Sequence, residues 1–207
     1  NLFDQMPETY IADGHHRSAS SAKLAAKYNA PQSGVDTKNH NYFLAYFMDE
    51  SSMKILEFNR LIKSLKKVDP EEFLKQLAEK FEIKELSKAQ NPSKEHEISM
   101  NLKGKWYRLT CKKEIINDAH PVACLDAEIL TQFILRPLLG IQDLKTDSNI
   151  SFVSGNLGLE AISDPIKHQK ADLGFVLFPV TMQQVKRVAD NRMIMPPKST
   201  WVEPKLR

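Results

Sequence analysis

Residues 10–17 read Tyr-Ile-Ala-Asp-Gly-His-His-Arg, and no other stretch of the chain has so definite a pattern. A short apolar run leads into Asp13 and Gly14, a pair typical of a tight turn, and a segment rich in Ala and Ser follows. The pattern predicts a strand at residues 9–12, a glycine turn, and a helix from His16 to about Tyr28.

A helix that begins at this turn would bring several anion-binding groups together. The N-terminus of a helix has N–H groups without partners in the helix and carries a partial positive charge. Gly14 lets the backbone approach a ligand closely, and Arg17 can bind phosphate oxygens through two N–H groups. His15 and His16 can donate to phosphate or move protons near neutral pH, and Ser18 adds a hydroxyl donor. These residues are therefore predicted to form a phosphate site.

Asp13 stands at the end of the expected strand, where its carboxylate can orient a histidine, hold Mg²⁺ or position a hydroxyl group. In the alternative interpretation Asp13 only caps the helix, and the two histidines are solvated on its first turn. Eight residues do not decide between these two interpretations. A metal site made by His15 and His16 is disfavoured, because adjacent helical residues point about 100° apart and no third ligand is evident.

The composition limits the class of protein. The chain has 207 residues, 42% of them hydrophobic, which is enough for one large domain or two small ones to bury a core. Its 29 Lys and Arg against 26 Asp and Glu leave a net charge of +3, which argues against a protein that coats nucleic acid. The apolar runs are too short to span a membrane, and two cysteines without a CxxC motif exclude a disulfide framework. We expect a soluble, cytoplasmic protein.

The rest of the chain predicts an α+β fold, with a mixed sheet, hairpins and flanking helices. Helix starts are marked by Asp69 before Pro70, by Asp126, and by Thr181 with Gln184, which fits a capping box. A shorter helix is expected from Leu157. The expected strands are residues 42–48, 54–58, 98–102, 106–111, 150–153 and 173–180.

Two separated segments resemble one family. Residues 10–23 (YIADGHHRSASSAK) and 187–207 (RVADNRMIMPPKSTWVEPKLR) look like the bacterial and archaeal family called domain of unknown function 1015. The resemblance covers the chain as the C-terminal half of such a protein, and it implies an N-terminal half as a partner. The chain starts at Asn1 without an initiator Met, so we expect it to be part of a longer protein.

The Asp-Gly-His-His-Arg string is also similar to the nucleotide-binding box of the ParB-like superfamily, which includes free-serine kinases, sulfiredoxin and CTP-hydrolysing chromosome-partition proteins. This resemblance implies that Gly14, His15 and Arg17 hold phosphate and that Asp13 and His16 are catalytic. It implies ADP or ATP with Mg²⁺ as the cofactor. It also implies the end of a ParB-like unit at residues 1–50, followed by an α+β domain at 51–207.

A second family string, Thr-His-Arg-Leu, corresponds here to residues 58–61, Phe-Asn-Arg-Leu. Asn59 therefore stands where the family has a histidine, and an amide cannot titrate. This change argues against a catalytic role for the position, whereas Arg60 remains a candidate anion contact.

The C-terminal string offers a further candidate site. Lys198, Ser199 and Thr200 follow two prolines and present one charge and two hydroxyls, a set that can bind phosphate or carboxylate. The alternative is a rigid turn that packs Trp201 onto the core.

Three functions remain open at this point. The first is a nucleotide-dependent phosphotransferase, a small-molecule kinase acting on a hydroxyl compound such as free serine. The second is a module that senses a nucleotide or phosphometabolite without turnover, which Asn59 favours. The third is a nucleic-acid-associated ParB-like adaptor, disfavoured by the near-neutral charge and by the lack of a recognisable helix-turn-helix segment.

Overall fold

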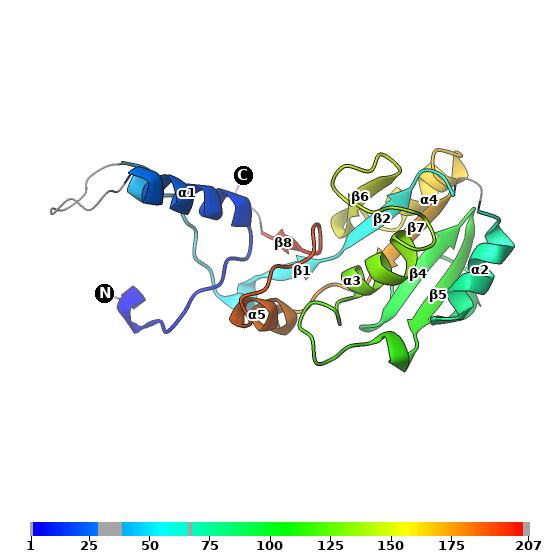
Figure 1. Cartoon of the computed structure of the whole chain (residues 1–207), viewed down its shortest axis with the longest axis horizontal. Coiled ribbons are helices and arrows are strands. Elements are labelled where there is room, and N and C mark those ends of the chain that lie inside the picture. Colours follow the sequence, from blue (N-terminus) through cyan, green and yellow to red (C-terminus); the bar gives the residue numbers. More distant parts are fainter. Residues whose placement is uncertain (1, 29–38, 66–67, 205–207) are drawn as a thin grey trace. The chain divides into compact units, whose positions relative to one another are not determined.

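The computed structural model describes residues 2–28, 39–65 and 68–204 (Figure 1). The chain divides into two units, of which the first comprises residues 1–54 with 204–207 and the second residues 55–203. None of the described helices has the length and the apolar character needed to cross a membrane.

The first unit contains one long helix. Helix α1 spans His15–Tyr28, which confirms the helix expected from His16. Short 3-10 helices span Leu2–Gln5, Asn39–Asn41 and Glu50–Ser52.

The strands expected at residues 9–12 and 42–48 are not formed. A strand needs a neighbour to take up its N–H and C=O groups, and within the described ranges no strand pairs with either segment. The aromatic side chains of the second segment are exposed, as is Leu44, at 94%. The hydropathy of residues 42–48 predicts a buried strand, whereas the described residues do not cover these side chains.

The second unit is built on a six-stranded sheet with the order β3-β5-β4-β7-β2-β6. Every neighbouring pair in it is antiparallel, so the α+β class is confirmed, but this sheet is antiparallel where a mixed sheet was expected. A separate two-stranded sheet joins β1 to β8. The strands are β1 (Lys54–Leu56), β2 (Phe58–Ile62), β3 (Phe81–Leu86), β4 (Glu97–Leu102), β5 (Lys105–Cys111), β6 (Ile150–Ser154), β7 (Leu173–Leu177) and β8 (Trp201–Glu203).

Helices α2 (Pro70–Ala78), α3 (Asp126–Leu130), α4 (Glu160–Lys167) and α5 (Met182–Asp190) belong to this unit, and a π-helical turn, Thr131–Leu135, continues α3. The capping predictions are confirmed. The Asp69 carboxylate accepts the N–H groups of Glu71 and Glu72, and Thr181 and Gln184 form a complete capping box. Helix α4 begins later than the expected Leu157, which ends a 3-10 helix instead.

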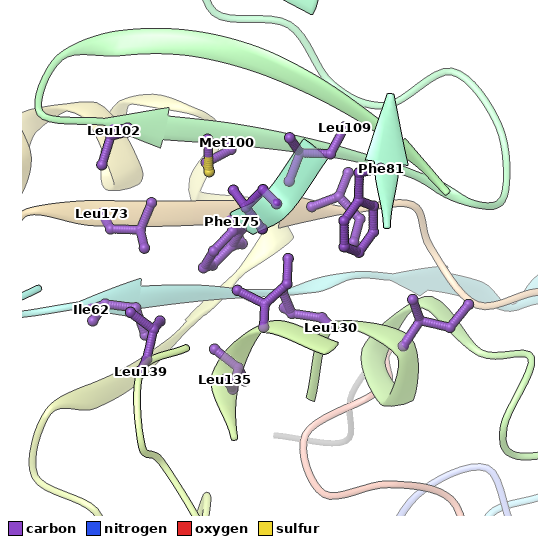
Figure 2. Packing of buried hydrophobic residues seen from close by; sticks show 14 of the residues in the cluster. Ile62, Phe81, Met100, Leu102, Leu109, Leu130, Leu135, Leu139, Leu173 and Phe175 are labelled. Carbon is purple, nitrogen blue, oxygen red and sulfur yellow. The ribbon is translucent and has the colours of Figure 1, made fainter. Parts of the chain in front are cut away.

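The core lies on both faces of the sheet. On one face, Met100, Leu173 and Phe175 of the sheet lie opposite two leucines (Figure 2). These are Leu130 in α3 and Leu135 in the π-helical turn that follows it. Helix α2 adds to the same face. On the other face, α4 packs Ile162 and Ile166 against Trp106 and Val176. Neighbouring residues of a strand point to opposite faces, so one sheet supplies side chains to both layers.

Candidate functional site

The turn before α1 has the conformation that its glycine permits. Gly14 has a φ of +80°, in the left-handed region, and its N–H donates to Asp13 Oδ1 at 2.8 Å. The Gly14 carbonyl accepts the N–H of Ser18 at 2.9 Å, the first hydrogen bond of the helix. We call residues 13–18 the glycine box.

The side chain of Arg17 folds back over Gly14. A Cβ atom on Gly14 would lie 3.2 Å from Nη2 and 3.4 Å from Nε of Arg17. Glycine is therefore favoured twice here, by its backbone conformation and by the space that the guanidinium takes. Any other side chain would strain the turn and push Arg17 away.

The glycine box can bind an anion. The first N–H groups of a helix lack acceptors within it, and Arg17 supplies a charged donor beside them. Asp13, His15 and Arg17 are exposed, whereas Ser18 is half-buried. The backbone of His16 lies in α1, but its side chain falls outside the described part of the structure, so its predicted catalytic role remains a prediction.

Arg60 lies in the middle of β2 and has no exposed surface. Its Nη1 donates to the Phe58 carbonyl, and its guanidinium carbon lies 5.3 Å from the centre of the Phe152 ring. Burial lowers the pKa of Arg60 to about 9, so the side chain stays protonated at neutral pH.

Asn59, beside it, has a structural role. Its Oδ1 accepts the N–H of Leu177 at 3.1 Å and thus ties β2 to β7, while its Nδ2 lies 3.4 Å from Glu57 Oε1. The side chain is 1% exposed. A titrating group is not needed for this contact, which is consistent with an amide where the family string has a histidine.

The C-terminal string packs near the end of β2. Lys198 is exposed, has a φ of +54°, and places Nζ 5.3 Å from the centre of the Phe58 ring. The buried Ser199 hydroxyl donates to the Pro196 carbonyl, and Thr200 is half-buried. Trp201 packs edge-on against Phe58, with ring centres 5.5 Å apart. This is the turn that seats Trp201 on the core, and it also leaves Lys198 available to a ligand.

The predicted site residues thus fall into two groups. Those of the glycine box belong to the first unit, whereas Arg60 and the Lys198–Thr200 string belong to the second. Within the second unit the string and β2 meet at Phe58.

The structure also contains a histidine–carboxylate pair, His96 and Asp126, that the sequence pattern does not predict. Asp126 Oδ1 accepts both the backbone N–H of His96, at 2.9 Å, and its ring Nδ1–H, at 3.2 Å. Asp118 lies 4.0 Å from the ring Nε2. The hydrogen bond that the His96 ring donates to Asp126 raises the pKa of His96, and burial raises the pKa of Asp126. A small cavity lined by Asp126, Gln184 and Ser199, among others, adjoins this pair.

Residues 1–128 match the family described as "Protein of unknown function (DUF1015)". The chain belongs to this family. The match includes the glycine box and Arg60 but ends before Lys198, so the C-terminal string lies outside the part of the chain that shows membership.

Two solved structures share the fold of this DUF1015 chain. A conserved hypothetical protein from Pyrococcus furiosus is 19% identical, with a TM-score of 0.51 over 96% of this chain and 72% of that chain. A free serine kinase in complex with AMP is 17% identical, with a TM-score of 0.50 over 93% of this chain and 66% of that chain. No curated protein matches the sequence. At these identities the likeness extends to the fold only.

Proposed function

We propose that this DUF1015 protein binds a nucleotide through the glycine box and transfers a phosphoryl group to a small hydroxyl compound, with free serine as the nearest analogy. The observation that carries the proposal is the left-handed Gly14 with the Arg17 guanidinium folded over it, at the start of a 14-residue helix. A free serine kinase of the same fold was solved with AMP, which supports a nucleotide as the ligand.

Phosphoryl transfer depends mainly on positioning and on neutralising negative charge. In the proposed reaction the N–H groups of the first turn, with Gly14, His15, Arg17 and Ser18, hold the phosphates. The acceptor oxygen bonds to the terminal phosphorus as the bond to the nucleotide breaks. The hydroxyl proton passes to Asp13, with His16 as the second acid–base group. Mg²⁺ bound with the nucleotide would neutralise further phosphate charge.

The alternative is a sensing module that binds the same ligand without turnover. Asn59 favours it, because a buried amide that holds the backbone of β7 occupies the place of the family histidine. Both functions require the glycine box to bind nucleotide, so binding is tested first and turnover second.

Binding is tested by calorimetric titration of the chain with ADP and ATP, each with Mg²⁺. We expect Arg17→Ala to weaken binding by about 1.5–3 kcal/mol, the range for hydrogen bonds to a charged group. Lys23→Ala removes a positive charge from the exposed surface of the same helix and should leave the affinity nearly unchanged. Equal affinities for the wild type and Arg17→Ala would remove Arg17 from the site.

Turnover is tested with Asp13→Asn. The amide oxygen of the new side chain can still accept the Gly14 N–H, but the amide cannot take up the hydroxyl proton. Phosphorus NMR of the chain with nucleotide, Mg²⁺ and serine or other small alcohols would follow the product. We expect the variant to bind nucleotide but to form no phosphorylated product. Full activity of the variant would exclude Asp13 as the base, and binding without turnover by the wild type would favour the sensing module.

A further inference from the structure

Arg60 carries a buried charge without a full set of partners. Its Nη1 donates to the Phe58 carbonyl, but Nε and Nη2 have no hydrogen-bond partner among the residues that the structure describes. Unsatisfied buried donors are rare and unfavourable, and those of a charged group more so. A central strand position that only had to fill the core would be better occupied by an apolar side chain.

A second unpartnered donor lies on the same face. In the β2–β6 pairing, Phe58 stands opposite Ser154 and Arg60 opposite Phe152. Opposed residues, and residues two apart in a strand, share a face, so Ser154 is the diagonal neighbour of Arg60. The Ser154 hydroxyl is buried and has no partner within the described ranges.

The surroundings of these donors carry positive charge. Lys198 places its ammonium group over the ring of Phe58, which stands opposite Ser154 and two residues before Arg60 in β2. No described carboxylate forms an ion pair with Arg60. Glu57, which immediately precedes β2, points to the opposite face, where its carboxyl group lies against Gly155.

We propose that Arg60 and Ser154, with Lys198 at the outer edge, form a second oxyanion site, which binds a carboxylate or phosphate group of the second substrate. The assignment to a second substrate rests on the proposed phosphotransferase function, whereas the oxyanion site itself does not. Two oxygens would accept the parallel N–H groups of Nε and Nη2, the forked geometry that arginine offers to such groups. The Ser154 hydroxyl would donate to the same group.

The oxyanion must move part of the protein to reach Arg60, because that side chain has no exposed surface. Trp201 and Lys198 cover Phe58 at this end of the strand. Binding is therefore expected to shift Trp201, and its fluorescence reports on the site. Trp106, the other tryptophan, lies in the core on the opposite face.

The test uses the full chain with inorganic phosphate and with acetate, at constant ionic strength balanced by chloride. Melting temperature and tryptophan fluorescence are measured for the wild type and for Arg60→Met, Ser154→Ala and Arg17→Ala. We expect at least one anion to raise the melting temperature and change the fluorescence of the wild type. Preference for acetate would identify a carboxylate ligand, and preference for phosphate a phosphorylated one.

Arg60→Met places a long apolar side chain beside Phe152 and removes the unpaired donors. We expect this variant to melt no lower than the wild type without anion, and to lose both anion responses. Ser154→Ala should weaken anion binding several-fold with little change in anion-free stability. Its matched control is Ser99→Ala, because Ser99 also has a buried, unpartnered hydroxyl but pairs with Val176 on the opposite face.

Arg17→Ala separates this proposal from the proposed function. Retained anion responses in Arg17→Ala, and their loss in Arg60→Met, would support the second site even if no nucleotide binds the glycine box. Wild-type responses in Arg60→Met, or in Ser154→Ala if Arg60→Met fails to fold, would overturn it. So would the absence of any anion response in the wild type.

Discussion

His96 is held in a backbone conformation that few residues adopt. Its φ of +66° lies in the left-handed region, where His, Asn and Asp are several-fold enriched over other residues with a side chain. Asp126 fixes it there by accepting two hydrogen bonds, one from the backbone and one from the ring. Asp118 and Glu95 add negative charge around the ring, so all the described charges that act on His96 favour its protonated form.

This pair makes stability depend on pH. The pKa of His96 is raised in the folded chain by the hydrogen bond with Asp126, relative to about 6.5 in an unfolded chain. Its stabilisation is therefore complete below about pH 6.5 and is lost as the pH rises through the folded-state pKa. The raised pKa of Asp126 acts in the same direction at lower pH.

We expect the free energy of unfolding of the wild type to exceed that of His96→Asn most at pH 5.5 and least at pH 8.5. Asn suits the left-handed conformation and does not titrate, so the comparison isolates the charge. Urea denaturation across this range measures the difference. Asp126→Asn should remove the same pH dependence, and a difference that does not vary with pH would disprove the role of the His96 charge.

The glycine box could be recognised because its residues are consecutive, so the string itself specifies a turn, a helix start and an arginine. The His96–Asp126 pair could not, because its members are 30 residues apart and meet only when the β4–β5 hairpin packs beside α3. The burial of Arg60 was equally hidden. Nothing in the string at residues 58–61 distinguishes an arginine inside a sheet from one at its edge.

At the scale of elements, local signals predicted helix starts well. Asp69 and the Thr181–Gln184 capping box place the starts of α2 and α5, because caps act within one helical turn. The strands were harder to assign. Phe81 continues the apolar spacing of α2, yet it begins β3, because the sheet offers β5 as a partner.

Helix α4 is held against the sheet by a position that only glycine fits. A Cβ atom on Gly174 in β7 would lie 2.4 Å from Cγ2 of Ile162, closer than real contacts allow. Gly174→Ala should therefore lower the free energy of unfolding by about 1–3 kcal/mol, as overpacking does. Urea denaturation of Gly174→Ala, Ile162→Ala and the double variant measures the coupling. Because Ile162→Ala removes the clashing methyl, we expect the double variant to be less destabilised than the sum; strict additivity would contradict this contact.

At the scale of the whole molecule, the order of strands depends on pairings between distant segments. Strand β2 lies between β6 and β7, which follow it by many residues, and no local pattern specifies that choice. The apolar runs at residues 42–48 and 173–180 both predict a strand. In the second run only Leu173–Leu177 forms a buried central strand, shorter than expected, whereas the first run has no strand beside it among the described residues.

Two equal truncations test this contrast. Leu173 in β7 is 0% exposed and Leu44 is 94% exposed. Leu173→Ala should lower the free energy of unfolding by about 2–5 kcal/mol, through lost burial and the cavity that remains. Leu44→Ala should change it by less than about 0.5 kcal/mol, as is usual at an exposed position. Urea denaturation followed by tryptophan fluorescence and by circular dichroism measures both. A large loss in Leu44→Ala would show that the run at residues 42–48 is buried in solution, as its hydropathy predicted.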